Sequence, residues 1–339
     1  MENYILRAYR ASDAQAVADV INKSAIRTVG FKRGVVDSIG NLWAYRFVPF
    51  SSERMVAIDK DTEVVGYAYF RSGDGHIVGE TGASVHPDHW DKGIGTALLA
   101  WAEERAMEDS AEAPQGIRTV LQTICYEAER DVIQLFEDRG FRKVREWRHF
   151  VVDMKEQPAV PTLARHLTLR EMDLDSDWDI VGPCMDEAFA THWGAIPPGS
   201  YEIVQKEDSQ ENESGEEEEI AEDGSDSNTP GYCFIILDGD TVAGGVLCNA
   251  KLVERVDTGR IGSIFVGPHY RRQGLGRALL LTAFNAFWKN GVRRIILDTD
   301  SKSSSNTASL YQGVGMKPYR SEFVYEKEIR PGREVRLLR

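Results

Sequence analysis

Hydrophobic and polar positions follow two different periods along this chain, and together they predict a repeated series of strands and helices. Short runs rich in β-branched and aromatic residues, such as 63–70 and 241–248, predict strands. Stretches 93–107 and 274–289 place apolar residues three and four positions apart, which predicts long amphipathic helices. Because strands and helices alternate in one order in both halves, we expect a mixed α/β fold that is built twice.

The expected elements occur in the same order in each half. They are, in the first half, 4–7, 14–24, 55–58, 63–70, a strand ending at Val85, 93–107, 119–125 and 129–139, and, in the second, 167–170, 177–189, 232–237, 241–248, a strand ending at Val266, 274–289, 294–298 and 306–314. A last strand is expected to close each copy. This order predicts an α/β domain with a mixed sheet in each half.

An internal repeat supports the duplication. Segments 85–99 and 266–280 share the frame V-x-P-x-x-x-x-x-G-[IL]-G-x-A-L-L at an offset of 181 residues. Further matches follow in the same order: Leu6-Arg7 with Leu169-Arg170, Val65-Gly66 with Ala243-Gly244, Leu135-Phe136 with Leu310-Tyr311, and Gly140-Phe141 with Gly315-Met316. The period is much longer than a solenoid unit, so we interpret it as a duplicated domain.

The repeat and the local composition suggest the domain boundaries. We expect an N-terminal domain at 1–153, a linker at 154–165 where prolines and charges lack periodicity, a C-terminal domain at 166–331 and a basic tail at 332–339. Segment 206–230 is acidic and of low complexity. It contains too few apolar residues to bury, so we expect a disordered insertion within the C-terminal domain.

Composition and charge exclude several classes of function. The 339 residues suffice for about two domains, and the net charge of −14 comes mostly from eleven acidic residues within 207–226. The positive and negative charges of the remaining residues nearly cancel, so nucleic-acid binding is not expected. The chain has no apolar run of about 18 residues and its first residues lack the pattern of a secretory signal, so we expect a cytoplasmic protein without membrane contact. The four cysteines and seven histidines lack metal-ligand spacing, so no metal is expected.

The most specific chemistry lies before the second long helix, in Arg271-Arg272-Gln273-Gly274-Leu275-Gly276. Its two glycines permit a tight turn and the close approach of a ligand to the backbone. The unpaired N–H groups and partial positive charge of a helix start favour phosphate oxygens, and Arg271, Arg272 and Arg277 add full charges. The loop lacks the lysine of a P-loop. It also lacks the third glycine of the dinucleotide fingerprint, because Leu279 stands there.

This loop, after a strand ending in V-x-P and before A-L-L, resembles the acetyl-CoA signature of the GNAT N-acetyltransferase superfamily. Asn306-x-x-x-x-Tyr311-x-x-x-Gly315-Met316 resembles the second signature of that family, with methionine in place of phenylalanine. The resemblance covers both halves and implies two tandem GNAT acyl-CoA N-acyltransferase folds. The two-domain arrangement and the segment 189–194 resemble those of mycothiol synthase-like acetyltransferases.

The resemblance implies roles for the second copy. The strand end Ile264-Phe265-Val266 would separate from its neighbour, hydrogen-bond the pantetheine arm of acetyl-CoA and polarise the thioester carbonyl. The pyrophosphate would be held by the amides of Arg271, Arg272, Gln273, Gly274, Leu275, Gly276 and Arg277. Asn306 would contact the cofactor, and Tyr311 would protonate the departing thiolate after direct attack by a neutral amine. Apart from the motif, a tyrosine on the buried face of a helix is more often a core residue.

The first copy departs from this pattern. Trp90-Asp91-Lys92 stands in place of Arg271-Arg272-Gln273, and Phe136 stands in place of the tyrosine. We therefore expect a structural or regulatory copy. A degenerate second site for the cofactor would consist of Val85, Lys92, Gly93, Gly95 and Thr96. Glu80 lies on the strand before the loop, and we interpret it as an exposed or paired glutamate instead of a base.

The general base of the second copy is not identified by the sequence, because its strand 260–264 has no carboxylate. Candidates acting through water are Glu254, Asp257, Glu187 and His192, each of which is also explained as a solvated or structural residue. His192 and Trp193 are alternatively assigned to the wall of the acceptor pocket.

Our leading hypothesis is an enzyme, a monomer or homodimer, that transfers an acetyl or related short acyl group from acetyl-CoA to a primary amine of a small molecule. The alternative is a catalytically silent CoA-sensing or interaction module. The retained loop and Tyr311 favour the enzyme, whereas the missing strand carboxylate favours the silent module. The sequence does not identify the acceptor.

Overall fold

The computed structural model describes residues 4–36, 42–44, 53–197, 200, 231–249, 257–302 and 307–338. The chain divides into two compact units. The described part of unit 1 comes from Met1–Glu146, Pro198–Asp223 and Glu322–Val335, and that of unit 2 from Trp147–Pro197, Gly224–Ser321 and Arg336–Arg339. The predicted insertion at 206–230 lies outside the described residues and stays a prediction.

Unit 1 contains a mixed sheet with the strand order β1-β4-β5-β6-β7-β14, in which β6 and β7 are parallel and the other described pairs are antiparallel. Its elements are β1 (Tyr4–Ala8), η1 (Ala11–Asp13), α1 (Ala14–Val29), β2 (Gly34–Val36), β3 (Leu42–Ala44), β4 (Glu53–Asp59), β5 (Val64–Ser72), η2 (Asp74–His76), β6 (Val78–Val85), η3 (Pro87–His89), α2 (Ile94–Asp109), β7 (Thr119–Tyr126), α3 (Arg130–Asp138) and most of β14 (Lys317–Arg330).

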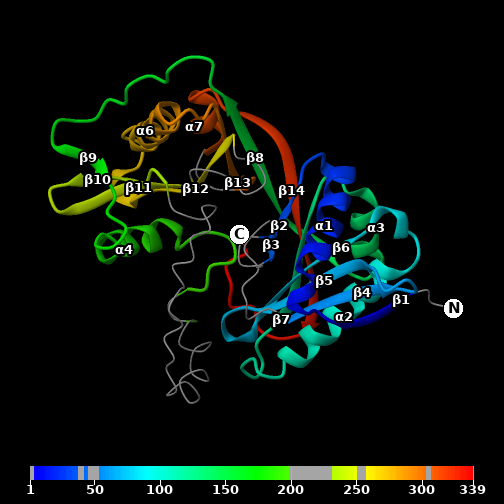
Figure 1. The fold of residues 1–339 in the computed structure, drawn as a ribbon. Coiled ribbons are helices and arrows are strands. Elements are labelled where there is room, and N and C mark those ends of the chain that lie inside the picture. Colours follow the sequence, from blue (N-terminus) through cyan, green and yellow to red (C-terminus); the bar gives the residue numbers. More distant parts are fainter. Residues whose placement is uncertain are drawn as a thin grey trace. The chain divides into compact units, whose positions relative to one another are not determined.

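Helices cover both faces of the unit 1 sheet because successive strand residues point to opposite sides. Helix α1 buries Val17 against Val56 and Tyr67 on one face. Helix α2 buries Ile94 and Leu98 on the other face. Figure 1 shows these helices around the blue and cyan strands.

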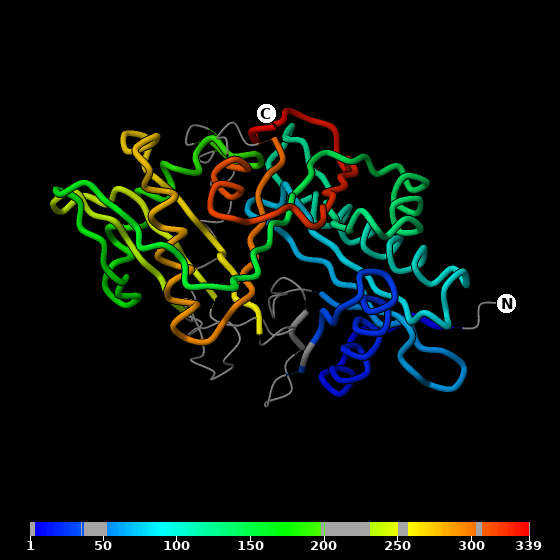
Figure 2. Tube along the Cα trace, turned by 90° about the horizontal axis from the view of Figure 1, so that it is seen from above, coloured from blue at the N-terminus to red at the C-terminus, as the bar shows by residue number. Residues whose placement is uncertain are grey.

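Unit 2 repeats this design with the strand order β8-β13-β12-β11-β10-β9, and here β12 and β13 are the parallel pair. Its elements are most of β8 (Arg142–Asp153), β9 (Leu167–Glu171), α4 (Trp178–Phe189), β10 (Phe234–Asp238), β11 (Thr241–Asn249), β12 (Thr258–Val266), η5 (Pro268–Tyr270), α6 (Leu275–Lys289), β13 (Arg294–Asp300) and α7 (Thr307–Gly313). Helices α4 and α6 lie on opposite faces of its sheet (Figure 1), and α6 is seen lying on the strands in the view from above (Figure 2).

The predicted mixed α/β class and its duplication are confirmed, and the predicted strands and helices form near their expected bounds. The short hairpin of β2 and β3, in which Val36 pairs with Leu42, was not expected from the sequence. Within the described part of the chain, no helix is both long and apolar enough to cross a membrane.

The closing strand of each sequence repeat completes the sheet of the other unit. Strand β8 follows α3 along the chain but pairs with β13, where Phe150 lies opposite Leu297. Strand β14 follows α7 but pairs with β7, where Tyr325 lies opposite Thr123. The compact units are therefore discontinuous in sequence, although the continuous boundaries of the duplicated sequence stay a prediction.

Backbone hydrogen bonds also hold the segment after β14. In unit 1, the Arg333 N–H donates to the Gly116 carbonyl at 2.7 Å, and the Arg333 carbonyl accepts a bond from the Arg118 N–H at 3.0 Å. In unit 2, the Leu337 N–H donates to the Ala195 carbonyl at 2.8 Å, and the Leu337 carbonyl accepts a bond from the Gly194 N–H at 2.7 Å. The predicted basic tail is thus tied down where it is described, at two points of the fold.

Candidate functional site

The parallel strands of each unit separate toward their carboxyl ends. In unit 2, β12 and β13 pair in register at Thr258, Gly259 and Arg260, although β12 continues to Val266. In unit 1, β6 and β7 pair from Val78 to Thr81 and then part in the same way. The edges that face each other beyond these points carry backbone groups without a partner in that pair, which suits an extended ligand that carries amides. The expected residues Ile264, Phe265 and Val266 lie on the separated part of β12.

The glycine loop has the same backbone conformation in both units. Gly274 precedes α6 with φ of 85°, and Arg272 has φ of 64°. Gly93 and Asp91 have φ of 80° and 60° at the matching positions. Left-handed values are unusual for arginine and aspartate. Such turns direct successive N–H groups into a concave nest that binds anions, and the first amides of the following helix add unpaired donors.

The residue at the start of this loop makes an equivalent bond in each unit. Arg271 Nε donates to the Val266 carbonyl at 3.2 Å, and Trp90 Nε1 donates to the Val85 carbonyl at 2.8 Å. Arg271 also donates to the Ala188 carbonyl at the end of α4, at 3.1 Å. Both side chains therefore fasten the loop to the strand that precedes it, and the exchange of arginine for tryptophan removes a charge without removing this bond.

A second equivalent bond lies two residues further along. Gln273 Nε2 donates to the His269 carbonyl at 3.2 Å, and Lys92 Nζ donates to the Asp88 carbonyl at 2.7 Å. Together with the matching φ angles, these bonds show that the first unit keeps the conformation of the loop. The substitutions in the first copy change its charge and not its path.

The other two arginines of the expected phosphate site differ in their contacts. Arg277 Nη1 donates to the Gly313 carbonyl at 2.5 Å, at the end of α7, where the helix dipole favours a cation. Arg272 is exposed at the tip of the loop. Arg271 and Arg277 thus already bond to backbone carbonyls, so less side-chain charge is available around the helix start than the sequence suggested.

Tyr311 is buried on α7, with 4% of its surface exposed. Its ring meets the edge of Phe150 from β8, with centroids 5.4 Å apart. Burial raises the pKa of Tyr311 to about 12, while the nearby Thr299 side chain on β13 acts in the opposite direction. The phenol therefore keeps its proton at neutral pH, as a proton donor must.

The matching position in unit 1 is Phe136, and its neighbour on the exchanged strand is a tyrosine. The rings of Phe136 and Tyr325 lie 5.6 Å apart. Each unit thus holds one phenylalanine and one tyrosine at this contact, with the two residues interchanged between helix and strand. The Tyr325 hydroxyl donates to the exposed carboxylate of Glu137 at 3.1 Å, so unit 1 has a phenol that points to the surface. Sequence reasoning missed Tyr325 because its strand belongs to the other repeat.

The two units carry opposite charges at the place where their parallel strands part. Arg260 and Glu80 each occupy the third in-register pair of those strands. Arg260 Nη2 donates to Asp298 Oδ1 on β13 at 2.6 Å. Glu80 forms an ion pair with Arg71 on β5, as the interpretation of a paired glutamate predicted. Asp298 was missed because it lies on β13, across the gap, instead of on the strand before the loop.

The expected acceptor-side residues follow α4. The exposed His192 packs on Phe189 with ring centroids 4.8 Å apart, and Phe189 packs in turn on Phe265 at 6.4 Å. Trp193 is half-buried next to it, beside the backbone bonds that Leu337 makes. This places His192 one aromatic ring away from the separated end of β12.

The remaining candidates for a base are not gathered at the strand ends. Glu187 is exposed on α4, and Asp257 accepts a bond from the Thr258 hydroxyl at 3.0 Å, before β12 has reached its separated part. Glu254 and Asn306 lie outside the described residues, so their roles stay predictions.

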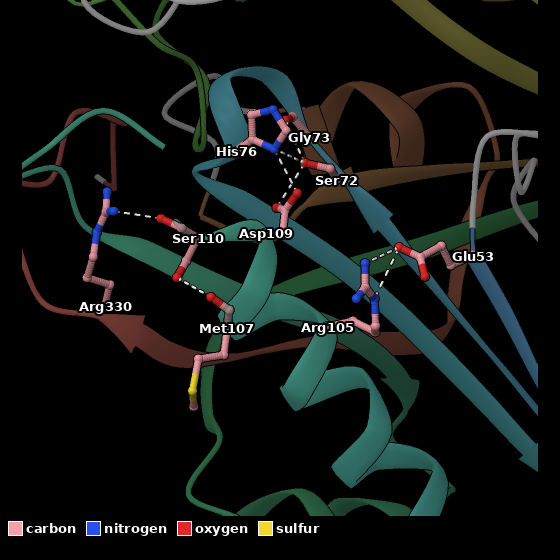
Figure 3. Close-up of polar contacts among 9 residues, drawn as sticks. All are labelled: Glu53, Ser72, Gly73, His76, Arg105, Met107, Asp109, Ser110 and Arg330. Carbon is pink, nitrogen blue, oxygen red and sulfur yellow. Dashed lines mark hydrogen bonds and ion pairs between the residues drawn. The ribbon is translucent and has the colours of Figure 1, made fainter. Parts of the chain in front are cut away.

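A serine, a histidine and an aspartate meet elsewhere in unit 1 but do not form a nucleophilic triad (Figure 3). His76 Nδ1 lies 3.1 Å from Ser72 Oγ and 2.7 Å from Asp109 Oδ1. A triad requires the serine and the acid on opposite nitrogens of the ring. The cluster includes Asp109, the last residue of α2, and next to it Arg330 Nη1 donates to the Ser110 carbonyl at 2.6 Å.

Two parts of the chain, residues 32–141 and 199–316, each match the Acetyltransferase (GNAT) family. The two matches cover most of the chain and correspond to the two copies of the repeat. They identify it as a tandem acetyltransferase. A search of curated proteins found no match.

Solved structures with the same fold agree with the tandem arrangement. A GCN5-related N-acetyltransferase from Sphaerobacter thermophilus is similar with a TM-score of 0.73 and 23% identity, over 98% of each chain. A tandem GNAT protein from the clavulanic acid biosynthesis pathway is similar with a TM-score of 0.68 and 15% identity, over 97% of this chain and 100% of that one. At these identities the likeness shows the fold. The closer resemblance to mycothiol synthase-like enzymes stays a prediction.

Proposed function

This chain belongs to the acetyltransferase (GNAT) family, and on that basis we propose that unit 2 transfers the acetyl group of acetyl-CoA to a primary amine of a small molecule. The family supports acyl-CoA-dependent N-acetyl transfer in general. The choice of the unit, the acceptor class and the residue roles are our proposal. A cytoplasmic location and a monomeric or homodimeric state stay predictions.

The observation that carries the assignment to unit 2 is the buried phenol of Tyr311. Its pKa is influenced by Thr299, which lies on β13 beyond the point where β12 and β13 part. The corresponding side chain in unit 1 is Phe136, and the hydroxyl of the nearby Tyr325 donates its hydrogen bond to Glu137. Only the second unit therefore offers a phenol on the helix beside its separated strands.

The residues of unit 2 fit acetyl-CoA. The nest at Arg272 and Gly274 and the first amides of α6 suit the pyrophosphate. A Cβ placed at Gly274 would meet no other atom within 4 Å, so there is room for a ligand against this backbone. The separated end of β12, at Ile264, Phe265 and Val266, suits the amides of the pantetheine arm. The proposed contacts to the cofactor are completed by Arg271, Gln273, Leu275, Gly276 and Arg277. Asn306, which lies outside the described residues, is proposed as a further contact.

The proposed reaction is direct attack of the neutral amine nitrogen on the thioester carbonyl carbon. Backbone N–H groups at the end of β12 would stabilise the developing oxyanion. The carbon–sulfur bond then breaks, and the Tyr311 hydroxyl gives its proton to the sulfur. The proton of the amine leaves to solvent. His192 and Trp193 are proposed to line the side from which the acceptor approaches.

For unit 1 we propose cofactor binding without turnover. The proposed degenerate site consists of Val85, Lys92, Gly93, Gly95 and Thr96, on a loop whose path matches that of unit 2. Asp91 places a negative charge at the tip of this loop, where Arg272 stands in unit 2. We expect the affinity for acetyl-CoA to be lower in unit 1 for this reason.

One observation favours the silent module as a second candidate. Arg260 stands at the register position of Glu80, so β12 carries a cation there instead of a carboxylate. A unit without any group to assist the amine would bind CoA and not turn over. Asp298, which accepts a bond from Arg260 across the two strands, is a carboxylate that the enzyme hypothesis can use.

Release of free CoA from acetyl-CoA, measured with a thiol reagent in the presence of a panel of amines, distinguishes these functions. The panel should include amino-acid derivatives, polyamines, aminoglycosides and N-terminal peptides. The proposal predicts amine-dependent release and an acceptor that is heavier by one acetyl group. Tight binding of acetyl-CoA with no release for any amine would support the silent module.

A further inference from the structure

Three hydroxyl groups of unit 2, on Thr307, Thr299 and Tyr311, are arranged so that they can form a chain that ends at Tyr311. Thr307 begins α7, and its Oγ1 lies 3.2 Å from Thr299 Oγ1 on β13. Tyr311 lies one turn after Thr307 on the same helix, and the Thr299 side chain acts to lower the pKa of its phenol. Both threonines are half-buried, and Thr299 belongs to the part of β13 that has separated from β12.

A threonine hydroxyl has one proton to donate, so the direction of this chain has consequences. We propose that Thr307 donates to Thr299 and Thr299 donates to Tyr311 Oη. The proton of Tyr311 is then left to point away from both threonines. Thr299 and Thr307 are thus positioning residues, which aim the phenol proton at a ligand sulfur without themselves touching the substrate. This inference rests on the proposed acid role of Tyr311.

The arrangement also opposes the effect of burial on the pKa of Tyr311. Burial raises the pKa of Tyr311 to about 12, and the nearby carboxylate of Asp298 acts in the same direction. A phenol of such low acidity is a poor proton donor at neutral pH. A hydrogen bond received from Thr299 stabilises the phenolate and therefore opposes both effects. Thr299 consequently makes Tyr311 a stronger acid as well as an oriented one.

Unit 1 shows the same positions without the hydroxyls. Val132 lies four residues before Phe136, and Thr307 lies four residues before Tyr311, so Val132 corresponds to Thr307. On the strands, Leu121 pairs with Gly79 and Ile295 pairs with Gly259. Cys125 lies four residues after Leu121, and Thr299 lies four residues after Ile295, so Cys125 corresponds to Thr299.

All three hydroxyls of unit 2 are therefore absent together from unit 1, where the positions hold Phe136, Cys125 and Val132. A threonine that only filled space in the core would not need to vary together with the tyrosine. The joint difference is what we expect of groups that serve one proton.

The test compares Thr299→Val, Thr299→Ser and Thr307→Val in the full-length protein, with acetyl-CoA and an accepted amine. Thr299→Val keeps the shape but removes the donor. We expect it to lower kcat about tenfold, as for a lost hydrogen bond to a developing charge, with unchanged calorimetric affinity for acetyl-CoA. Thr299→Ser restores the hydroxyl and should recover most of kcat. Thr307→Val, one bond further away, should lower kcat about two- to threefold. The matched control in unit 1 is Cys125→Val, which should leave kcat unchanged.

A double-mutant cycle with Tyr311→Phe separates positioning from mere packing. If Thr299 acts through the phenol, then Thr299→Val adds nothing to the loss of kcat already caused by Tyr311→Phe. A further tenfold loss in the double variant would overturn the inference, as would a normal kcat in Thr299→Val. If kcat is normal in Thr299→Val but reduced in Tyr311→Phe, the inference fails and the proposed function stands. If kcat is also normal in Tyr311→Phe, both fail.

Discussion

The two units keep the same loop conformation with different residues and differ at the position proposed for the catalytic acid. Trp90 and Arg271 fasten the glycine loop through one equivalent bond, and Lys92 and Gln273 through another. In contrast, the phenol of Tyr311 has no counterpart on the helix of unit 1, where Phe136 stands.

This difference separates two requirements on the duplicated sequence. A backbone carbonyl accepts a bond from an indole, a guanidinium, an amide or an ammonium group, so the loop tolerates wide substitution. A proton donor beside a thioester must have a titratable hydrogen on a particular atom, which only a few side chains supply. Residue identity at the loop is therefore a weak guide to its conformation, while identity at the acid position is a strong guide to chemistry.

The largest expected effect comes from the glycine that precedes each long helix. Valine in place of Gly274 should abolish turnover, because its side chain would cover the amides that face the phosphates. Valine in place of Gly93 carries a similar backbone strain, since the φ angles are 85° and 80°, but should leave most turnover intact. Steady-state kinetics and thermal unfolding of both variants check this. Equal losses of turnover in the two variants would contradict a single active unit.

The exchanged strands allow a second comparison. Phe150→Ala and Tyr325→Ala each remove a buried ring from equivalent contacts, and each should lower the free energy of unfolding by about 3–5 kcal/mol. Per folded molecule, only Phe150→Ala should reduce kcat, because only that ring packs against Tyr311. Chemical denaturation and active-site-normalised kinetics provide the two readouts. A similar kcat for both variants would argue against a special role of this contact.

A matched pair of ion pairs should show no difference between the units. Arg7 holds Asp13 through two bonds of 2.7 and 2.8 Å, and Arg170 holds Asp177 through two of 2.5 and 2.7 Å. The bonds from arginine lower the pKa of Asp13 and lower that of Asp177 to about 2. Their contribution to stability is complete above the ordinary aspartate pKa of about 3.9 and is lost as the pH falls toward 2.

Acid unfolding of Arg7→Met and Arg170→Met tests this symmetry. Each variant should weaken the pH dependence of stability between about pH 4 and pH 2, and the two should do so alike. Circular dichroism during an acid titration is the measurement. An effect in one variant alone would show that the repeated ion pair has diverged in function.

The smallest effect is expected from the acidic segment, which distinguishes the second copy most visibly in the sequence. Replacement of residues 207–230 with a short Gly/Ser linker should leave the melting temperature and the affinity for acetyl-CoA nearly unchanged, since loop length adds only slowly to the closure entropy. Differential scanning calorimetry and titration calorimetry measure these quantities. A fall of several degrees in the melting temperature would mean that the segment packs against the fold.

The sequence predicted most of the fold because its signals were local. Periodic apolar positions located α2 and α6, and the repeated V-x-P frame located the loop between each strand and helix. The exchange of β8 and β14 left no such signal. A strand alternates apolar and polar residues in the same way whichever sheet it joins. Its own sequence pattern therefore does not indicate which distant segment it pairs with.

The candidate site was predictable only in part for a similar reason. Tyr311 and Gly274 stand in contiguous motifs, whereas Thr299, Phe150 and Asp298 come to the same region from other strands. The expected role of Arg271 as a charge for phosphate met a competing demand, because the Val266 and Ala188 carbonyls take up its guanidinium. A sequence shows which donors exist but not which carbonyl lies nearest to them.

The proposed catalytic role of unit 2 depends on Tyr311, so the decisive comparison is the kcat of Tyr311→Phe beside that of Phe136→Tyr. We expect Tyr311→Phe to lower kcat about 10²-fold, near the lower end for general acid catalysis, with calorimetric binding of acetyl-CoA nearly unchanged. Removal of one oxygen should cost about 1 kcal/mol of stability or less. Phe136→Tyr should leave kcat as it is. An unchanged kcat in Tyr311→Phe, at full cofactor binding, would contradict the acid role and with it the assignment of catalysis to unit 2.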